Sequence, residues 1–217
     1  MSSLFETPRY IAIEGPIRAG KSSLAQLLAG SLHAQLLHEP EENAFLGDFY
    51  KDKPGAAFQS QMAFLLGRYQ QLLKLEEAQP RHLVIADYLF EKDRIFANLN
   101  LSDEELAVYD GYQKLFRQRL RQPDLVIYLQ ASVETLQQRL KKKAQPQERR
   151  ISEEYLESVV RAYEYFFFHY SATDLLIVNT NQMDFVERSR DLQQLLRKLS
   201  EPIKGTQYFL PLTEDAG

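Results

Sequence analysis

A glycine-rich segment near the N-terminus has the residue types and the spacing needed to hold a polyphosphate. Residues 15–22 match the pattern G-x-x-x-x-G-K-[ST]. Glycines near both ends let backbone N–H groups turn toward anionic oxygens, a lysine can reach the terminal phosphates, and a serine hydroxyl can ligate Mg²⁺. The candidate phosphate-binding residues are Gly15, Pro16, Ile17, Arg18, Ala19, Gly20, Lys21, Ser22 (also a candidate metal ligand) and Ser23.

The flanking residues predict the two elements between which such a loop must lie. Residues 10–13 are apolar and partly β-branched, which favours a buried strand. Residues 23–29 favour a helix whose positive N-terminal end faces the phosphates. The alternative is a glycine-containing turn that binds nothing. Strand, loop and helix in the required order favour a nucleoside triphosphate site over that alternative.

Strand-like and helical patterns alternate through the rest of the chain. Further strands are predicted at 35–38, 82–87, 124–129 and 175–178, and helices at 58–79, 103–121, 133–143, 152–168 and 185–199. Buried strands separated by helices predict an α/β fold with a five-stranded parallel sheet flanked by helices. The C-terminal ends of the strands then meet at one edge of the sheet, where ligands bind in such folds.

Two carboxylates follow predicted strands at this edge. Glu39 comes after the second strand and Asp87 after the third. A carboxylate at such a position can hold Mg²⁺ beside phosphates, or can take or orient the proton of an acceptor hydroxyl. Helix capping or a solvated charge is the alternative. The placement at strand ends favours the functional interpretation for both residues.

Composition limits the remaining classes of protein. No internal repeat or linker divides the 217 residues, which favours a single domain over 1–217. The net charge of −4 gives no reason to expect a nucleic-acid partner, and no apolar run approaches the roughly 20 residues that span a membrane. The lack of cysteine excludes disulfides and Cys-ligated zinc, and it fits a cytoplasmic protein.

Two further segments have an unusual composition. Residues 139–150 are rich in lysine and arginine, so this segment could close over a triphosphate as a lid, although a solvated basic turn is favoured on charge alone. Residues 205–212, within a tail at about 202–213, are unusually apolar. We expect this tail to pack on the body of the protein or on a partner.

With these residues in place, the chain resembles the deoxynucleoside kinases of the P-loop kinase superfamily, above all the bacterial deoxyadenosine, deoxyguanosine and deoxycytidine kinases. The likeness spans about residues 9–200. It implies the strand order 2-3-1-4-5, a homodimer, and a lid at about 139–151. It also implies transfer of phosphate from ATP, with Mg²⁺, to the 5′-hydroxyl of a deoxynucleoside in nucleotide salvage.

The resemblance implies roles for residues around the sugar and the phosphates. Glu39, in Glu39-Pro40, matches the base that faces the 5′-hydroxyl, and Tyr50 matches a tyrosine that contacts the 3′-hydroxyl. Glu148 aligns with a lid glutamate that reaches the same 3′-hydroxyl. Two cations of the lid region, Arg139 and Lys143, are implied to be catalytic, with Lys21 and Asp87. Asp87 would also contact the substrate and Mg²⁺.

The resemblance also implies two pockets for bases. Gln61 and Arg68 match the residues that hydrogen-bond the nucleobase of the substrate, and Asp93, in Asp93-Arg94, pairs with the same base. The aromatic residues Phe64 and Phe96 complete that pocket. The ATP adenine would pack against the loop that contains Asp184 and Phe185.

Three departures from the family pattern qualify these roles. Asp87-Tyr88-Leu89 stands where the family commonly has an acidic residue, arginine and serine, so the 5′-hydroxyl end is expected to lose a cation. Gln145 stands at a lid position where the family usually has an arginine, and Arg149 or Arg150 could supply the missing charge. Lys143 is not an equivalent of arginine, because lysine lacks the planar fork of the guanidinium. Arg18 occupies a loop position that is more often small.

The predicted base pocket favours some substrates over others. Asp93 beside Arg68 would accept an exocyclic amino group more readily than a thymine carbonyl, which favours deoxyadenosine, deoxyguanosine or deoxycytidine over thymidine. A nucleoside monophosphate kinase such as thymidylate kinase is one alternative, which Tyr88 disfavours. A nucleotide-binding regulatory module that has lost turnover is the other, and the cations missing at Tyr88 and Gln145 leave it open.

Overall fold

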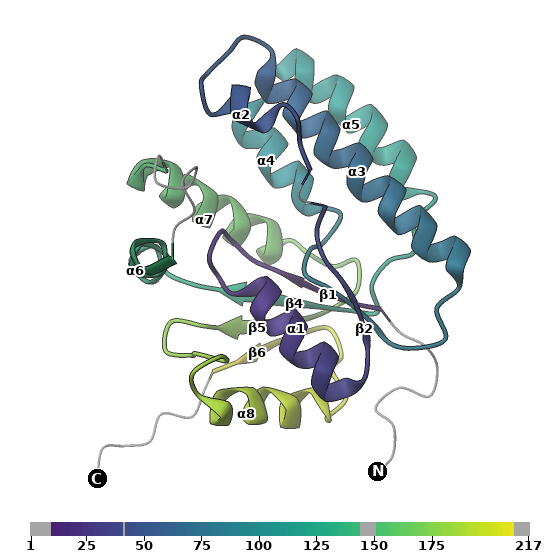
Figure 1. Ribbon diagram of the computed structural model, residues 1–217, viewed down its shortest axis with the longest axis vertical. Coiled ribbons are helices and arrows are strands. Elements are labelled where there is room, and N and C mark those ends of the chain that lie inside the picture. The colour runs from purple at the N-terminus through teal and green to yellow at the C-terminus, as the bar shows by residue number, and fades with distance from the viewer. Residues whose placement is uncertain (1–9, 41, 144–150, 211–217) are drawn as a thin grey trace.

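The computed structural model describes residues 10–40, 42–143 and 151–210 of the chain. Its centre is a parallel sheet with the strand order β2-β3-β1-β4-β5-β6 (Figure 1). The strands are β1 (Tyr10–Glu14), β2 (Gln35–Leu37), β3 (Val84–Ala86), β4 (Leu125–Gln130), β5 (Asp174–Asn179) and β6 (Thr206–Phe209). The predicted order of the first five strands is confirmed.

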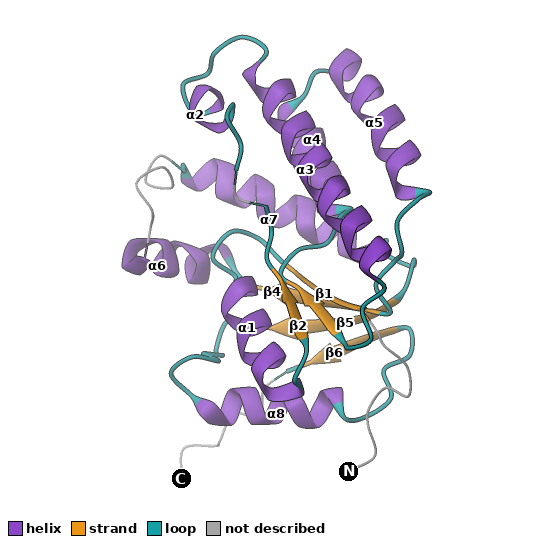
Figure 2. Ribbon diagram, turned by 45° about the vertical axis from the view of Figure 1, so that its right-hand side comes forward, coloured by secondary structure: helices purple, strands orange, loops and turns teal. Residues whose placement is uncertain are grey.

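Helices cover both faces of this sheet (Figure 2). One face carries α1 (Lys21–Leu32) and α8 (Ser189–Leu199), and the other carries α3 (Ala56–Ala78), α4 (Lys92–Asn100), α5 (Asp103–Arg117) and α7 (Glu153–Phe168). The short α2 (Leu46–Phe49) packs against α3, and α6 (Val133–Lys143) contacts α7. In the described residues no helix is long and apolar enough to cross a membrane.

Alternation along the strands produces two apolar cores. Ile11 and Ile13 of β1 pack in one cluster with Leu28 of α1. Ala12, between them, lies in the opposite cluster with Leu65 of α3. Successive strand side chains point to opposite faces, so a strand buried on both faces is apolar throughout. This explains why the predicted strands read as continuous apolar runs.

A sixth strand extends the sheet beyond the five that were predicted. Residues 206–209, which we interpreted as part of an apolar tail, form β6 and pair with β5 in parallel. Gly205, at φ +62°, turns the chain into this strand, and its N–H donates to Asp174 Oδ1 at 2.8 Å. The strand is short, it lies at the sheet edge, and its Thr206 and Tyr208 are exposed, so it lacks the buried pattern of the others.

Helix α4 was also absent from the sequence prediction. It has nine residues, it begins with Lys92 and Asp93, and it has no side-chain N-cap. The helices with serine N-caps were easier to predict. The Oγ of Ser102 accepts from Glu105 N–H at 3.3 Å, and Ser152 Oγ accepts from Tyr155 N–H at 3.1 Å. Helix α4 matters because it carries two charged residues into the region beyond the strand ends.

Candidate active site

The glycine-rich loop connects β1 to α1, as predicted, and two glycines in it are required for different reasons. A Cβ atom on Gly15 would lie 2.7 Å from the backbone oxygen of Leu129 in β4, so the strand ends can approach only with glycine there. Gly20 has φ +104°, a left-handed conformation that side chains disfavour. It immediately precedes Lys21, the first residue of α1, so the helix N-terminus opens onto the loop.

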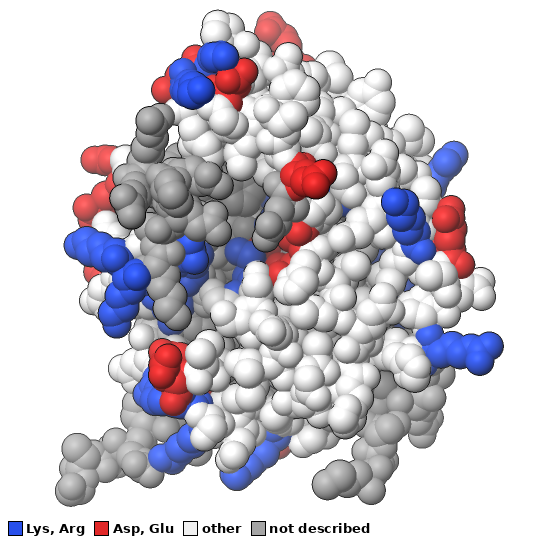
Figure 3. All heavy atoms as spheres, in the orientation of Figure 1, with Lys and Arg blue, Asp and Glu red and all other residues white. Residues whose placement is uncertain are grey.

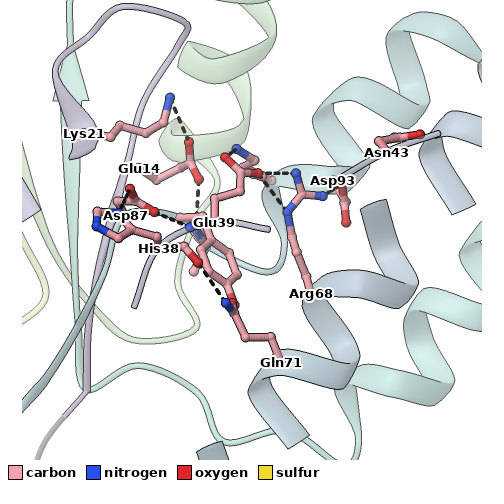
Figure 4. A network of polar contacts seen from close by, with 12 residues as sticks. Glu14, Lys21, His38, Glu39, Asn43, Arg68, Gln71, Asp87 and Asp93 are labelled. Atoms are coloured by element: carbon pink, nitrogen blue, oxygen red, sulfur yellow. Dashed lines mark hydrogen bonds and ion pairs between the residues drawn. The ribbon is translucent and has the colours of Figure 1, made fainter. Parts of the chain in front are cut away.

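Lys21 is held inside this loop by backbone oxygens. Its Nζ donates to Gly15 O at 2.7 Å and Pro16 O at 3.2 Å, and it lies 4.0 Å from Glu14 Oε1 (Figure 4). Burial lowers the pKa of Lys21, and the charge of Glu14 opposes that shift. The ammonium group is therefore kept beside the loop by weak acceptors that a phosphate can replace.

Glu14 is a fully buried carboxylate that sequence reasoning did not assign to the site. It accepts from the N–H groups of Gly15 and Leu89, each at 2.8 Å, and from the Tyr163 hydroxyl at 3.0 Å. These donors come from the loop after β1, the segment after β3 and α7. An acidic residue at the end of an apolar strand, directly before the loop, was the available sequence signal. Glu14 fixes three walls of the site relative to one another.

A cavity of about 860 Å³ lies beside the loop, bounded by α6 and the segment before α8. This volume is in the range of pockets that hold small molecules. Basic side chains gather on the flank at the height of α6 (Figure 3). The ionisable residues that line the cavity are Arg18, Lys21, Arg139, Lys142 and Arg188, with the carboxylates Glu39 and Asp184. A surface of this charge suits a polyanion.

Arg139 joins the two loops that bound this cavity. Its guanidinium donates to Ala19 O at 3.1 Å and to Thr180 O at 2.6 Å. Burial lowers the pKa of Arg139. The side chain thus serves the shape of the cavity as well as its charge. The side chain of Lys143, and Gln145, Glu148, Arg149 and Arg150 of the predicted lid, lie outside the described residues.

The predicted adenine loop also borders the cavity. The Asp184 carboxylate accepts from the N–H groups of Val186 at 3.1 Å and Glu187 at 3.0 Å, and these bonds lower its pKa. Asp184 therefore shapes the loop. Phe185 is 7% exposed and lies in the core next to α8, although part of it lines the cavity.

Asp87 joins the ends of β2 and β3. Its Oδ1 accepts from Glu39 N–H at 2.6 Å, and its Oδ2 lies 3.0 Å from His38 Nδ1 (Figure 4). No group of three or more potential metal-ligating side chains occurs in the described part of the chain. Mg²⁺ suits such a site, because it commonly takes one or two protein oxygens and completes its shell with phosphates and water. The hydroxyl of Ser22 and the carboxylate of Asp87 have the right chemistry.

Glu39 carries a cation on each carboxylate oxygen. Arg68 Nε donates to Oε1 at 2.9 Å, and Lys92 Nζ donates to Oε2 at 2.7 Å. Burial alone would raise the pKa of Glu39, but Lys92 and Arg68 outweigh it and hold that pKa well below its usual range. The carboxylate is ionised at neutral pH, and it lines the same cavity as Lys21.

The expectation that this end of the site lacks a cation was wrong. Tyr88 does point elsewhere, since its hydroxyl donates to Gln71 Oε1 at 2.5 Å. Lys92, in the first turn of α4, supplies the charge instead. Sequence reasoning missed it because α4 was not predicted, and therefore nothing placed residue 92 near residue 39.

Two of the predicted base-pairing residues, Arg68 and Asp93, come together next to Glu39 (Figure 4). Arg68 pairs with Asp93 Oδ1 as well as with Glu39, and its guanidinium lies 4.9 Å from the centre of the Phe64 ring. Among the described residues, Gln61 Oε1, Asp93 Oδ2 and the Tyr109 hydroxyl are buried without a hydrogen-bond partner. Buried polar atoms are rarely left unpaired, so the oxygens of Gln61 and Asp93 are available to a ligand with donor groups.

The structure also describes two other predicted substrate residues. Phe96 is half-buried and meets the Tyr163 ring edge-on, with 6.1 Å between ring centres. Tyr50 is half-buried at the end of α2. The segment before α2 is tied to α3 by Asn43, whose Nδ2 donates to Ser60 O and Oγ, both at 3.0 Å.

Comparisons with known proteins identify a matching family. A model of the deoxynucleoside kinase family matches residues 11–204. The deoxyguanosine kinase of Bacillus subtilis (strain 168) is 35% identical over 207 residues, covering 91% of this chain and 99% of that protein. The deoxyadenosine kinase of Lactobacillus acidophilus is 26% identical over 214 residues, covering 90% and 97%. The structure of deoxyadenosine kinase from M. mycoides with bound dATP has a TM-score of 0.75 and 28% identity, covering 88% and 100%.

Proposed function

Because the chain belongs to the deoxynucleoside kinase family and is therefore a phosphotransferase, we propose that it transfers the γ-phosphoryl group of ATP to the 5′-hydroxyl of a deoxynucleoside. One observation carries this proposal. The carboxylate of Glu39, beside the base pocket, and the ammonium of Lys21, in the phosphate loop, line one cavity. A donor phosphate and an acceptor hydroxyl can therefore meet there. We also propose that the protein carries out this nucleotide salvage in the cytoplasm.

The transfer step follows from positioning and charge. A bond forms between the 5′-oxygen and the γ-phosphorus as the bond to the β,γ-bridging oxygen breaks, and ADP leaves. Loop amides and Lys21 hold the phosphate oxygens, with Arg139 beside them. A catalytic role of Lys143 remains a prediction, because its side chain lies outside the described residues. The 5′-hydroxyl proton passes to Glu39. Because the pKa of Glu39 is held low, its main contribution is to orient the hydroxyl until late in the reaction.

We include Mg²⁺ in the proposal, held on the protein by Ser22 and Asp87. When bound, it neutralises charge on the β- and γ-phosphates. Asp87 also fixes the backbone of Glu39 through the 2.6 Å hydrogen bond, so it would link the metal side to the acceptor side. The predicted closure of the lid at about 139–151, with Glu148, remains a prediction because most of that segment lies outside the described residues.

We propose a purine deoxynucleoside or deoxycytidine as acceptor. The unpaired oxygens of Gln61 and Asp93 can accept from amino groups of a base. Thymine has no exocyclic amino group. Its polar edge consists of two carbonyl oxygens and the N3–H donor. The relatives named above as deoxyguanosine and deoxyadenosine kinases support the same choice.

A panel of the four deoxynucleosides with Mg-ATP tests this function. We expect deoxyadenosine, deoxyguanosine or deoxycytidine to have the highest kcat/KM. Thymidine as the best acceptor would overturn the base assignment. dTMP as the best acceptor would select a nucleoside monophosphate kinase. Tight binding of ATP without transfer to any acceptor would select a regulatory module.

We further propose that the protein forms a homodimer through helices α5 and α7. Val108 and Leu115 of α5 are each 51% exposed, and Phe168 at the end of α7 is 82% exposed. Large apolar side chains gathered on helices favour a subunit interface. Sedimentation that shows only monomer at micromolar concentration would contradict this proposal.

A further inference from the structure

Lys92 occupies a position that is unfavourable for a lysine. Its side chain is 7% exposed, and it lies in the first turn of α4, where the helix dipole disfavours positive charge. Burying an ammonium group is costly unless a partner compensates for it. The partner that compensates is Glu39, whose Oε2 accepts from Lys92 Nζ at 2.7 Å. The helix dipole and the loss of solvation both disfavour Lys92 at this position, and the ion pair with Glu39 compensates for them.

The two cations on Glu39 are not equivalent. Arg68 divides its guanidinium between Glu39 and Asp93, and it lies over the Phe64 ring in the base pocket. A base that binds there competes for the same donors. Among the described residues, the Lys92 side chain pairs with Glu39 and with none of the base-pairing residues. Lys92 therefore stays paired with Glu39 when Arg68 forms hydrogen bonds to a base.

The charge of Lys92 also reaches the phosphate side. Lys92 acts on Lys21 across the site and contributes to the lowering of the Lys21 pKa, after burial and against Glu14. The carboxylate of Glu39 acts on Lys21 in the opposite direction. Glu39 thus lies in the field of one cation on the donor side and another on the acceptor side. That arrangement surrounds the place where the phosphoryl group is transferred.

We propose that Lys92 is a positioning residue for Glu39, aiming its carboxylate at the acceptor hydroxyl in place of the arginine that Tyr88 replaces. This inference rests on the proposed function. The lysine reaches the carboxylate from helix α4, whereas the family pattern puts the arginine directly after the third-strand acid. The contact to Oε2 fixes one oxygen and leaves Oε1 to exchange between Arg68 and the hydroxyl.

The test compares Lys92→Met, which removes the charge at similar length, with Lys92→Arg, which keeps it. We expect Lys92→Met to lower kcat by about 10²-fold, the scale of losing one preorganised donor. The KM for Mg-ATP should stay within about threefold, because the hydrogen bonds of Lys21 within the phosphate loop are retained. Lys92→Arg should recover most of the loss. Lys198→Met, which removes a surface lysine paired with Glu201, is the matched control and should leave kcat unchanged.

A double-mutant comparison separates positioning from mere stability. If Lys92 acts through Glu39, then Lys92→Met should cause no further loss of kcat in a Glu39→Gln background. Equal losses in both backgrounds, or a kcat for Lys92→Met near that of the parent, would overturn the inference. Lys92→Gln serves the same comparison if Lys92→Met does not fold. An unmodified protein that transfers no phosphate would instead refute the proposed function, so the two failures are distinguishable.

Discussion

The hydroxyl of Tyr163, in helix α7, donates a 3.0 Å hydrogen bond to Oε1 of Glu14 at the end of β1. Both residues are fully buried. The same carboxylate accepts from the N–H groups of Gly15 and Leu89. Tyr163 also meets the ring of Phe96, so one side chain touches the phosphate-loop anchor and the predicted nucleoside pocket. This contact joins helix α7 to the end of β1, directly before the glycine-rich loop.

Replacing Tyr163 with phenylalanine should therefore destabilise the fold. The change removes one of three donors from a buried carboxylate, and a hydrogen bond to a charged group contributes about 1.5–3 kcal/mol. Urea denaturation at neutral pH measures this loss. Tyr165→Phe is the matched control, because Tyr165 lies on the same helix and is 71% exposed. A Tyr163→Phe variant as stable as Tyr165→Phe would contradict the role given to Glu14.

Two glycine-to-alanine changes should have opposite effects on stability. In Gly15→Ala the new Cβ would lie 2.7 Å from Leu129 O, so the backbone must shift, at a cost of about 1–3 kcal/mol. Gly30 lies within α1 and has nothing within 4 Å of its Cβ position, so Gly30→Ala should stabilise by about 0.5–1 kcal/mol. Thermal unfolding checks both, and calorimetry should show weaker ATP binding for Gly15→Ala alone. Two variants that change stability in the same direction would refute the close approach of β1 and β4.

Lys21→Ala should remove turnover without unfolding the protein. Its ammonium group donates to the carbonyl oxygens of Gly15 and Pro16. In the variant, water can donate to these two oxygens instead. We expect kcat to fall by at least about 10²–10³-fold, as when a preorganised donor is lost from a transition state. Steady-state kinetics and circular dichroism give the two readouts. Turnover near that of the parent would exclude Lys21 from phosphoryl transfer.

Contiguous features of this site were predictable, and contacts between distant segments were not. The strand, loop and helix around Gly15 and Lys21 are local, so their residue types and spacing were enough. The partners of Glu39 and Glu14 are different. Lys92 lies 53 positions from Glu39, and Leu89 lies 75 positions from Glu14, and the chain carries no periodic pattern that links them. Only the sheet, which gathers strand ends at one edge, brings these residues together.

The family resemblance predicted which residues gather around the base, but it did not predict how they pair. Gln61, Arg68 and Asp93 were expected to face a base; all three are buried, and Arg68 pairs with both Glu39 and Asp93. That Arg68 would pair with Glu39 as well as with Asp93 follows from the approach of α3 to the end of β2. The pairing of one guanidinium with both carboxylates depends on how the elements pack, so residue types alone could not indicate it.

Asp93→Asn should change base selection more than it changes catalysis in general. The Oδ1 atom of Asp93 pairs with Arg68, and Oδ2 has no partner among the described residues. An amide at this position presents a donor where the carboxylate accepts, so an amino group of a base loses its acceptor. Leaving such groups unpaired costs about 1–3 kcal/mol, which corresponds to roughly 5- to 150-fold in kcat/KM.

We therefore expect kcat/KM to fall by about that factor for deoxyadenosine, deoxyguanosine and deoxycytidine, and by less for thymidine, whose O4 accepts from a donor. The KM for ATP should not change, since Asp93 lies on the acceptor side. Arg68 keeps its bonds to Glu39, which limits damage to the fold. Asp110→Asn, on the surface of α5 and paired with Arg94, is the matched control. An equal fall for all four deoxynucleosides would show that Asp93 supports the pocket without reading the base.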